Sequence, residues 1–153
     1  MKIKILTLFI LGCFAASAQQ DPNYTQYFNN ELVINPAYAG SNKLLTVGML
    51  LRKQWVNIEK SPSVFSFNIH QQLNNEKVGL GFTYVNDKIG VTNSHAFNGV
   101  ASYQIPISSK MKFQFGLNLG GTYYNADYAS VNVKDAGDTH FDGATSSKFA
   151  PNM

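Results

Sequence analysis

Residues 34–40 read Ile-Asn-Pro-Ala-Tyr-Ala-Gly, and they divide the chain into two parts with different periodicities. Pro36 fixes its own φ and disfavours the helical region for Asn35, so this pair predicts a turn. Gly40 permits backbone conformations that residues with a side chain resist. After this corner the apolar residues change from a helical period of about 3.6 to a strand period of about 2.

Downstream of the corner, apolar and polar residues alternate. In one such stretch every second residue from Phe113 to Leu119 is apolar, and the residues between them are Gln, Gly and Asn. Stretches of this kind occupy residues 44–55, 63–72, 78–84, 97–105 and 113–123. The period predicts antiparallel β-strands, and about ten residues is the length that a tilted strand needs to cross a bilayer. We therefore expect an all-β chain of about five strands.

The alternating segments have unusual polar faces. These faces carry Gly, Ser, Asn, Gln and Thr far more often than Lys or Glu, and only 14% of the chain is charged. Soluble domains average about 25% charged residues. An apolar outer face over a small, uncharged polar interior predicts an outer-membrane β-barrel that contacts lipid. A soluble secreted β-sandwich that binds carbohydrate or protein shares the same period and remains the alternative.

The N-terminus has the pattern of an export signal. Lys2 and Lys4 precede an apolar core, and Ala16-Ser17-Ala18 is a small-x-small cleavage signature. We therefore expect a cleavable signal peptide over residues 1–18, an N-terminal segment over 19–43 and a partial barrel over 44–153. Lipidation at Cys13 is the alternative to simple cleavage. Without the leader the net charge is +1, which is no footprint of nucleic-acid binding.

Two further features bear on orientation. Residues 21–32 predict a short amphipathic helix-like segment ahead of the strands. The expected connections are 56–62, 73–77, 87–94, 106–110 and 125–147, of which the first, third and fifth are the longer ones. Outer-membrane barrels have short periplasmic turns and long surface loops, so this parity predicts a periplasmic N-terminus. Aromatic residues near strand ends suit an interfacial girdle: Trp55, Tyr84, Tyr103, Tyr123 and Tyr124.

Four short stretches stand in order along the chain, preceded by Gln20-Asp21-Pro22. They are Asn35-Pro36-Ala37-Tyr38-Ala39-Gly40, Arg52-Lys53-Gln54-Trp55, Val78-Gly79-Leu80-Gly81-Phe82 and Asn86-Asp87-Lys88-Ile89-Gly90. Together they resemble the PorP/SprF family of type IX secretion system membrane proteins. The resemblance implies a non-enzymatic outer-membrane β-barrel that serves protein secretion and gliding motility. It implies partners among the secretion machinery or surface adhesins, and no small-molecule substrate.

The resemblance also suggests candidate partner-contact positions: Asn35, Pro36, Ala37, Tyr38, Ala39, Gly40, Arg52, Trp55, Asn86, Asp87, Lys88 and Gly90. Family members are longer than this chain, and the smallest membrane barrels have about eight strands. We therefore expect an incomplete barrel, either a fragment or a half completed by another chain. Residues 149–152 have the character of a lead-in to a further strand.

Other constellations of polar residues point to no active site. His70, His95 and His140 lack the spacing of metal ligands. Asp135, Asp138 and Asp142 crowd one loop, for which calcium binding and a solvated surface are the two interpretations. No nucleophile motif is present, so we expect no catalysis and no cofactor. Arg52 and Lys53 form either a cationic contact for a partner protein or lipopolysaccharide, or a solvated strand end anchored by Trp55.

Overall fold

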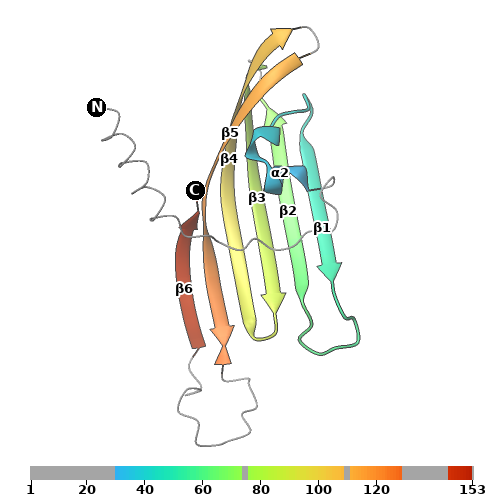
Figure 1. Ribbon diagram of the computed structural model, residues 1–153, viewed down its shortest axis with the longest axis vertical. Coiled ribbons are helices and arrows are strands. Elements are labelled where there is room, and N and C mark those ends of the chain that lie inside the picture. The colour runs from blue at the N-terminus through green and yellow to red at the C-terminus, as the bar shows by residue number, and fades with distance from the viewer. Residues whose placement is uncertain (1–29, 74–75, 109–110, 129–144, 153) are drawn as a thin grey trace, which may run out of the picture.

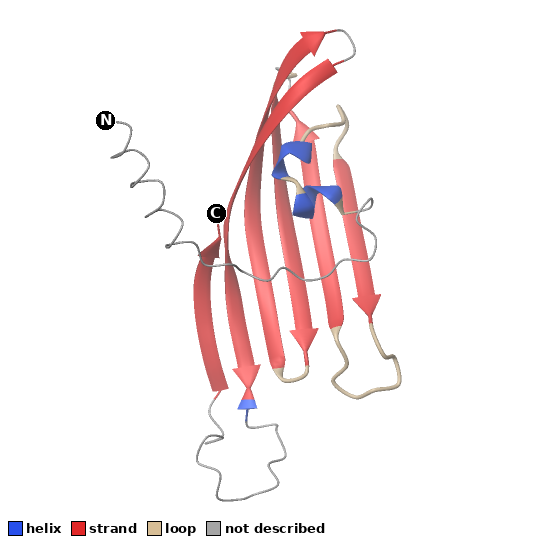
Figure 2. Ribbon diagram, viewed as in Figure 1, coloured by secondary structure: helices blue, strands red, loops and turns tan. Residues whose placement is uncertain are grey.

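The computed structural model describes residues 30–73, 76–108, 111–128 and 145–152. They form one antiparallel sheet in which each strand pairs with its neighbours in the sequence (Figure 1). The strands are β1 (Thr46–Lys53), β2 (Ser63–Gln72), β3 (Val78–Ile89), β4 (Thr92–Ser108), β5 (Met111–Asp127) and β6 (Thr145–Asn152). Two short helices, α2 (Glu31–Ile34) and η2 (Pro36–Tyr38), lie against one face of the sheet (Figure 2). The expected all-β antiparallel fold is confirmed.

The strand boundaries differ from the sequence prediction at the C-terminal end. The described residues form six strands, and β6 occupies the stretch expected to be only a lead-in. Phe149 is the only large apolar residue of β6, so its alternation is weak in the sequence. The strand forms because it pairs along β5, from Gly120 opposite Asn152 to Asp127 opposite Thr145.

The prediction of a longer loop at residues 87–94 is wrong. Strand β3 runs to Ile89 and β4 starts at Thr92, and these two residues pair across a tight turn. Gly90 supplies the positive φ of 61° that this turn requires. The polar residues assigned to a loop are strand residues here, and Asn86 Nδ2 donates to Asn93 Oδ1 at 2.6 Å across the ladder. The helix-like segment at residues 21–29 and the loop at 129–144 lie outside the described residues.

The sheet is inside out relative to a soluble protein, because it buries polar side chains and exposes apolar ones. Its buried face carries polar side chains such as Ser66, Thr83 and His70, whose exposed fractions are 0%, 1% and 2%. The opposite face exposes large apolar side chains, including Met49 at 69% and Leu117 at 74%. A soluble domain rarely exposes a contiguous apolar patch of this extent, whereas a membrane barrel has an apolar outer band and a polar interior.

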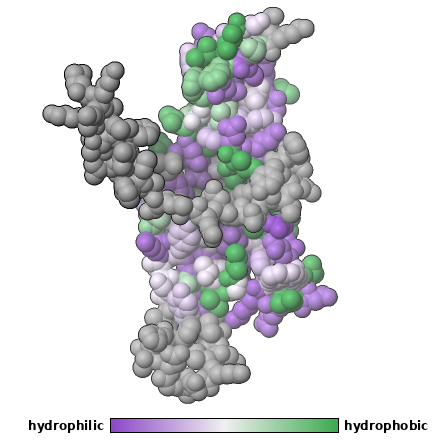
Figure 3. Space-filling view, in the orientation of Figure 1, coloured by the Kyte–Doolittle hydropathy of each residue, from purple (hydrophilic) through white to green (hydrophobic). Residues whose placement is uncertain are grey.

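The space-filling view in Figure 3 shows the side on which α2 lies, where polar colours cover much of the visible strands. Two small apolar clusters attach the N-terminal segment to this side. Leu32 and Ala39 pack with Val100, and Val33 packs against Val64 and Val85. We call this face the polar face and the opposite one the apolar face.

The described strands form an open sheet, because β1 pairs only with β2 and β6 only with β5. They include no second sheet over the apolar face, so the β-sandwich alternative finds no support. Among these residues no helix is long and apolar enough to span a membrane.

Candidate functional site

The segment at residues 35–40 has the local structure that its sequence predicts. The Asn35 side-chain oxygen accepts a hydrogen bond from the Ala37 N–H at 3.0 Å, and Pro36 starts η2 where its missing N–H costs nothing. Gly40 then takes a φ of 66°. The segment is therefore a corner, and the structure also shows which parts of the sheet it contacts. We call residues 35–40 the motif segment.

Side chains from the sheet bind the backbone of this corner. Three successive carbonyl groups, those of residues 39–41, accept hydrogen bonds from β4 and β5. The bonds are Ser102 Oγ to Ala39 O (2.5 Å), Gln114 Nε2 to Ala39 O (3.0 Å), Gln104 Nε2 to Gly40 O (2.7 Å) and Lys112 Nζ to Ser41 O (3.2 Å). Buried irregular backbone needs such partners, because water does not reach it. The polar face is thus a binding surface for the motif segment.

Strand glycines bring the two backbones into direct contact. A Cβ atom at Gly79 would overlap Ala39 O, and one at Gly116 would overlap the Ala37 backbone nitrogen. At Gly81 the same atom would come within 3.1 Å of the Leu32 side chain. Gly79 and Gly81 lie at the start of β3 and Gly116 lies on β5, on the side of the sheet that carries α2 and η2. The glycines therefore form a seat whose shape fits the motif segment.

His70, considered from the sequence only as a metal ligand, is a further partner of the motif segment. The Gly40 N–H donates to His70 Nδ1 at 3.1 Å. The edge of one ring meets the face of the other between Tyr38 and His70, with centroids 5.5 Å apart. The Glu31 carboxylate, hydrogen-bonded to the Tyr38 hydroxyl, raises the pKa of this phenol above its ordinary value. The imidazole acts here as a hydrogen-bond acceptor.

The structure divides the remaining sequence-predicted positions between two faces. Arg52 lies on the polar face, in the same register row as Asp87 with Val64 between them. Asn86 and Lys88 lie on the apolar face. Trp55 is 65% exposed in the β1–β2 connection, and Gly90 forms the β3–β4 turn. Of the candidate partner-contact positions predicted from the sequence, only those of the motif segment form one continuous site.

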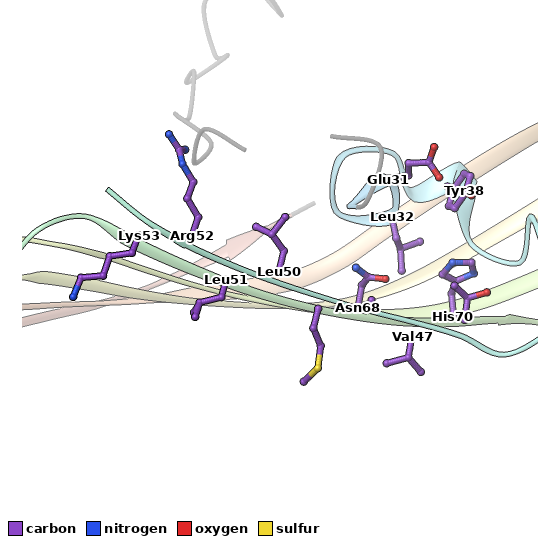
Figure 4. Close-up of a pocket in the computed structure, with 13 residues that line it drawn as sticks. Glu31, Leu32, Tyr38, Val47, Leu50, Leu51, Arg52, Lys53, Asn68 and His70 are labelled. Carbon is purple, nitrogen blue, oxygen red and sulfur yellow. The ribbon is translucent and has the colours of Figure 1, made fainter. Parts of the chain in front are cut away.

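A cleft of about 730 Å³ opens beside this site, between the two short helices and β1 (Figure 4). Glu31, Tyr38, Asn68 and His70 line one part of it, and Arg52 lines the other. In Figure 4 the Arg52 side chain points to the side of α2, whereas Lys53 points away from it. The cleft therefore combines a cation, an anion and amide groups next to the docked segment.

Sequence reasoning missed the partners of the motif segment: Ser102, Gln104, Gln114, Lys112 and His70. The available signal was their position on the polar side of alternating strands, together with interleaved glycines. No group of three or more His, Cys, Asp or Glu residues within the described ranges is placed to hold a metal ion. His140 and the aspartates of the candidate calcium loop lie outside those ranges.

The family comparison agrees with this geometry. Residues 16–153 match the family described as type IX secretion system membrane protein PorP/SprF. This chain belongs to the PorP/SprF family. Searches of curated proteins and of solved structures found no match. The PorP/SprF match includes all four stretches that carried the resemblance, and it makes the chain a membrane component of the type IX secretion system.

Proposed function

We propose that this PorP/SprF protein resides in the outer membrane after export by a cleaved signal peptide. There it assists secretion or surface anchoring of adhesins, as needed for gliding motility. It acts by binding partner proteins and performs no catalysis. The observation that carries the proposal is the inside-out sheet: polar residues are buried under the motif segment while the large apolar residues face outward. Lipid is the surrounding that stabilises such a surface.

The docked motif segment gives this proposal a physical basis for partner binding. It packs on the polar face, and the carbonyls of Ala39, Gly40 and the following Ser41 accept hydrogen bonds from strand side chains. Residues 19–29 precede α2 in the sequence. We place this side of the sheet in the lumen, with the N-terminal segment held ready for a periplasmic or secreted partner.

The connections support an orientation. The β1–β2 connection, residues 54–62, lies at the end of the sheet where β5 ends and β6 begins (Figure 1). Short connections join β2 to β3 and β4 to β5 at the opposite end. Long loops mark the cell surface in outer-membrane barrels, so the end with residues 54–62 is the surface end. The tight β3–β4 turn departs from this parity, as some hairpins of a barrel do.

Fractionation tests the location. The protein should remain in the detergent-resistant outer-membrane fraction and migrate differently in gels when unheated. A soluble sandwich would appear in the periplasm or medium and show no heat-dependent mobility. Recovery in the soluble fraction would refute the proposed membrane role.

A glycine variant tests the role of the motif segment. Gly116→Val places side-chain atoms where Ala37 lies, and it should displace the segment and reduce co-purification of secretion partners. Gly99→Val is the matched control, because a Cβ there meets only Leu119 O at 3.7 Å. Deletion of residues 21–39 should abolish co-purification altogether. Unchanged partner recovery in both the deletion and Gly116→Val would show that the segment does not recruit partners.

A further inference from the structure

Two lysines lie in one row on the apolar face, at the end of the sheet that we assign to the cell surface. Lys53 of β1 pairs with Ser63 of β2, and Ser63 pairs with Lys88 of β3. Neighbouring strands are about 4.8 Å apart, which places the two lysine backbones roughly 10 Å from each other. Both side chains are exposed, and neither forms an ion pair with a described residue.

This row lies at the boundary of the apolar surface. The next row toward the centre of the sheet contains Leu51, Phe65 and Asn86, and the following one contains Met49, Phe67 and Tyr84. Beyond the lysines come the β1–β2 connection and the β3–β4 turn. In a bilayer this is the depth at which acyl chains give way to head groups, and lysine side chains extend their ammonium groups to that level.

An ordered polar cluster adjoins Lys88 on the same face. Lys88 pairs with Asn93, whose side-chain oxygen accepts from Asn86 Nδ2 at 2.6 Å. Asn93 Nδ2 lies 3.0 Å from His95 Nε2, and the Tyr84 hydroxyl lies 2.9 Å from His95 Nδ1. Outward polar groups at the edge of an apolar belt are costly unless they have partners. These side chains satisfy one another and hold hydrogen-bonding groups in place beside the lysine.

We propose that Lys53, Ser63, Lys88 and Asn93 bind the phosphate groups of a phosphorylated glycolipid in the outer leaflet. Two cations about 10 Å apart complement a dianionic head group, and hydroxyl and amide groups between and beside them bind its remaining oxygens. The apolar rows below accept the acyl chains. The inference rests on the proposed membrane placement, and it adds a specific lipid site to it.

The test uses the full chain purified from membranes in mild detergent, with native mass spectrometry of added lipid A in its phosphorylated and dephosphorylated forms. Lys53→Gln/Lys88→Gln removes both cations and should weaken binding of phosphorylated lipid A by about tenfold or more. Lys43→Gln/Lys77→Gln loses the same charge at the opposite end of the sheet and controls for the loss of charge, although it also removes the Lys43–Glu76 ion pair. Dephosphorylated lipid A should bind all three proteins equally.

Two results would overturn the lipid site. One is equal binding of phosphorylated lipid A by the wild type and Lys53→Gln/Lys88→Gln. The other is equally tight binding of phosphatidylglycerol and phosphorylated lipid A, which would show that the lysines attract any anionic lipid. Asn93→Leu keeps both lysines and should lower the affinity several-fold if the cluster shapes the site. These failures are distinct from failure of the proposed function, because they would occur in a protein still recovered from the outer membrane.

Discussion

The Ser102 hydroxyl donates to the Ala39 carbonyl at 2.5 Å, although the two residues are 63 positions apart in the sequence. This bond joins the centre of β4 to the end of the motif segment. Gln114 donates to the same carbonyl from β5. The corner at residues 35–40 is thus held by two strands that lie much further along the sequence.

Removal of this bond should loosen the motif segment. Ser102→Ala should cost about 0.5–1.5 kcal/mol, since Gln114 still satisfies Ala39 O. Ser102→Ala/Gln114→Leu leaves that carbonyl buried without a donor and should cost more than the sum of the single variants. Protease cleavage rates within residues 30–41 measure the loss. Strict additivity would show that the two donors act independently.

His70 should be replaceable only by a side chain that accepts a hydrogen bond. Its Nδ1 accepts the Gly40 N–H, so His70→Leu leaves this buried donor unpaired at a cost of about 1–3 kcal/mol. His70→Gln retains an acceptor and should recover part of the stability. Urea unfolding in detergent compares the two variants. If His70→Gln and His70→Leu destabilise the protein equally, the contribution of His70 comes from the packing of its ring against Tyr38.

Neighbouring residues on β5 should respond to charge in opposite ways. Leu117 is 74% exposed on the apolar face, and Leu117→Lys should cost about 2–4 kcal/mol if that face contacts the bilayer core. Asn118 lies on the polar face, and Asn118→Lys should be tolerated better. The yield of folded protein in outer membranes is the measurement. Higher yield and solubility of Leu117→Lys would indicate that water surrounds this face.

The contact between Lys43 and Glu76 should depend on pH and salt. Their side chains meet at 2.6 Å, and this hydrogen bond lowers the pKa of Glu76 from its ordinary 4.5. A lowered folded-state pKa contributes stability above the unfolded value, and this contribution is lost as pH falls through the folded value. Glu76→Gln should remove that part of the acid sensitivity. Because both side chains are exposed, the effect should be small and should disappear in high salt.

Some features followed from local sequence rules. Alternation from Phe113 to Leu119 predicted a strand, and Asn35-Pro36 predicted the turn that η2 forms. The extension of β3 and β4 to Ile89 and Thr92 did not follow, since polar residues there have low strand propensity and are held by cross-strand pairing. Strand β6 was missed for a similar reason, because its pairing with β5 outweighs its weak pattern.

The sequence alone therefore determined the class of the fold, the two chemically different faces and the corner at residues 35–40. These depend on period and on the φ preferences of Pro36 and Gly40, which act within a few residues. The tertiary structure confirmed that the polar face is the buried one, and it alone showed which side chains bind the corner. The glycine seat and the Ser102 bond to Ala39 require a particular register among β3, β4 and β5, and register is a long-range property of the packed sheet.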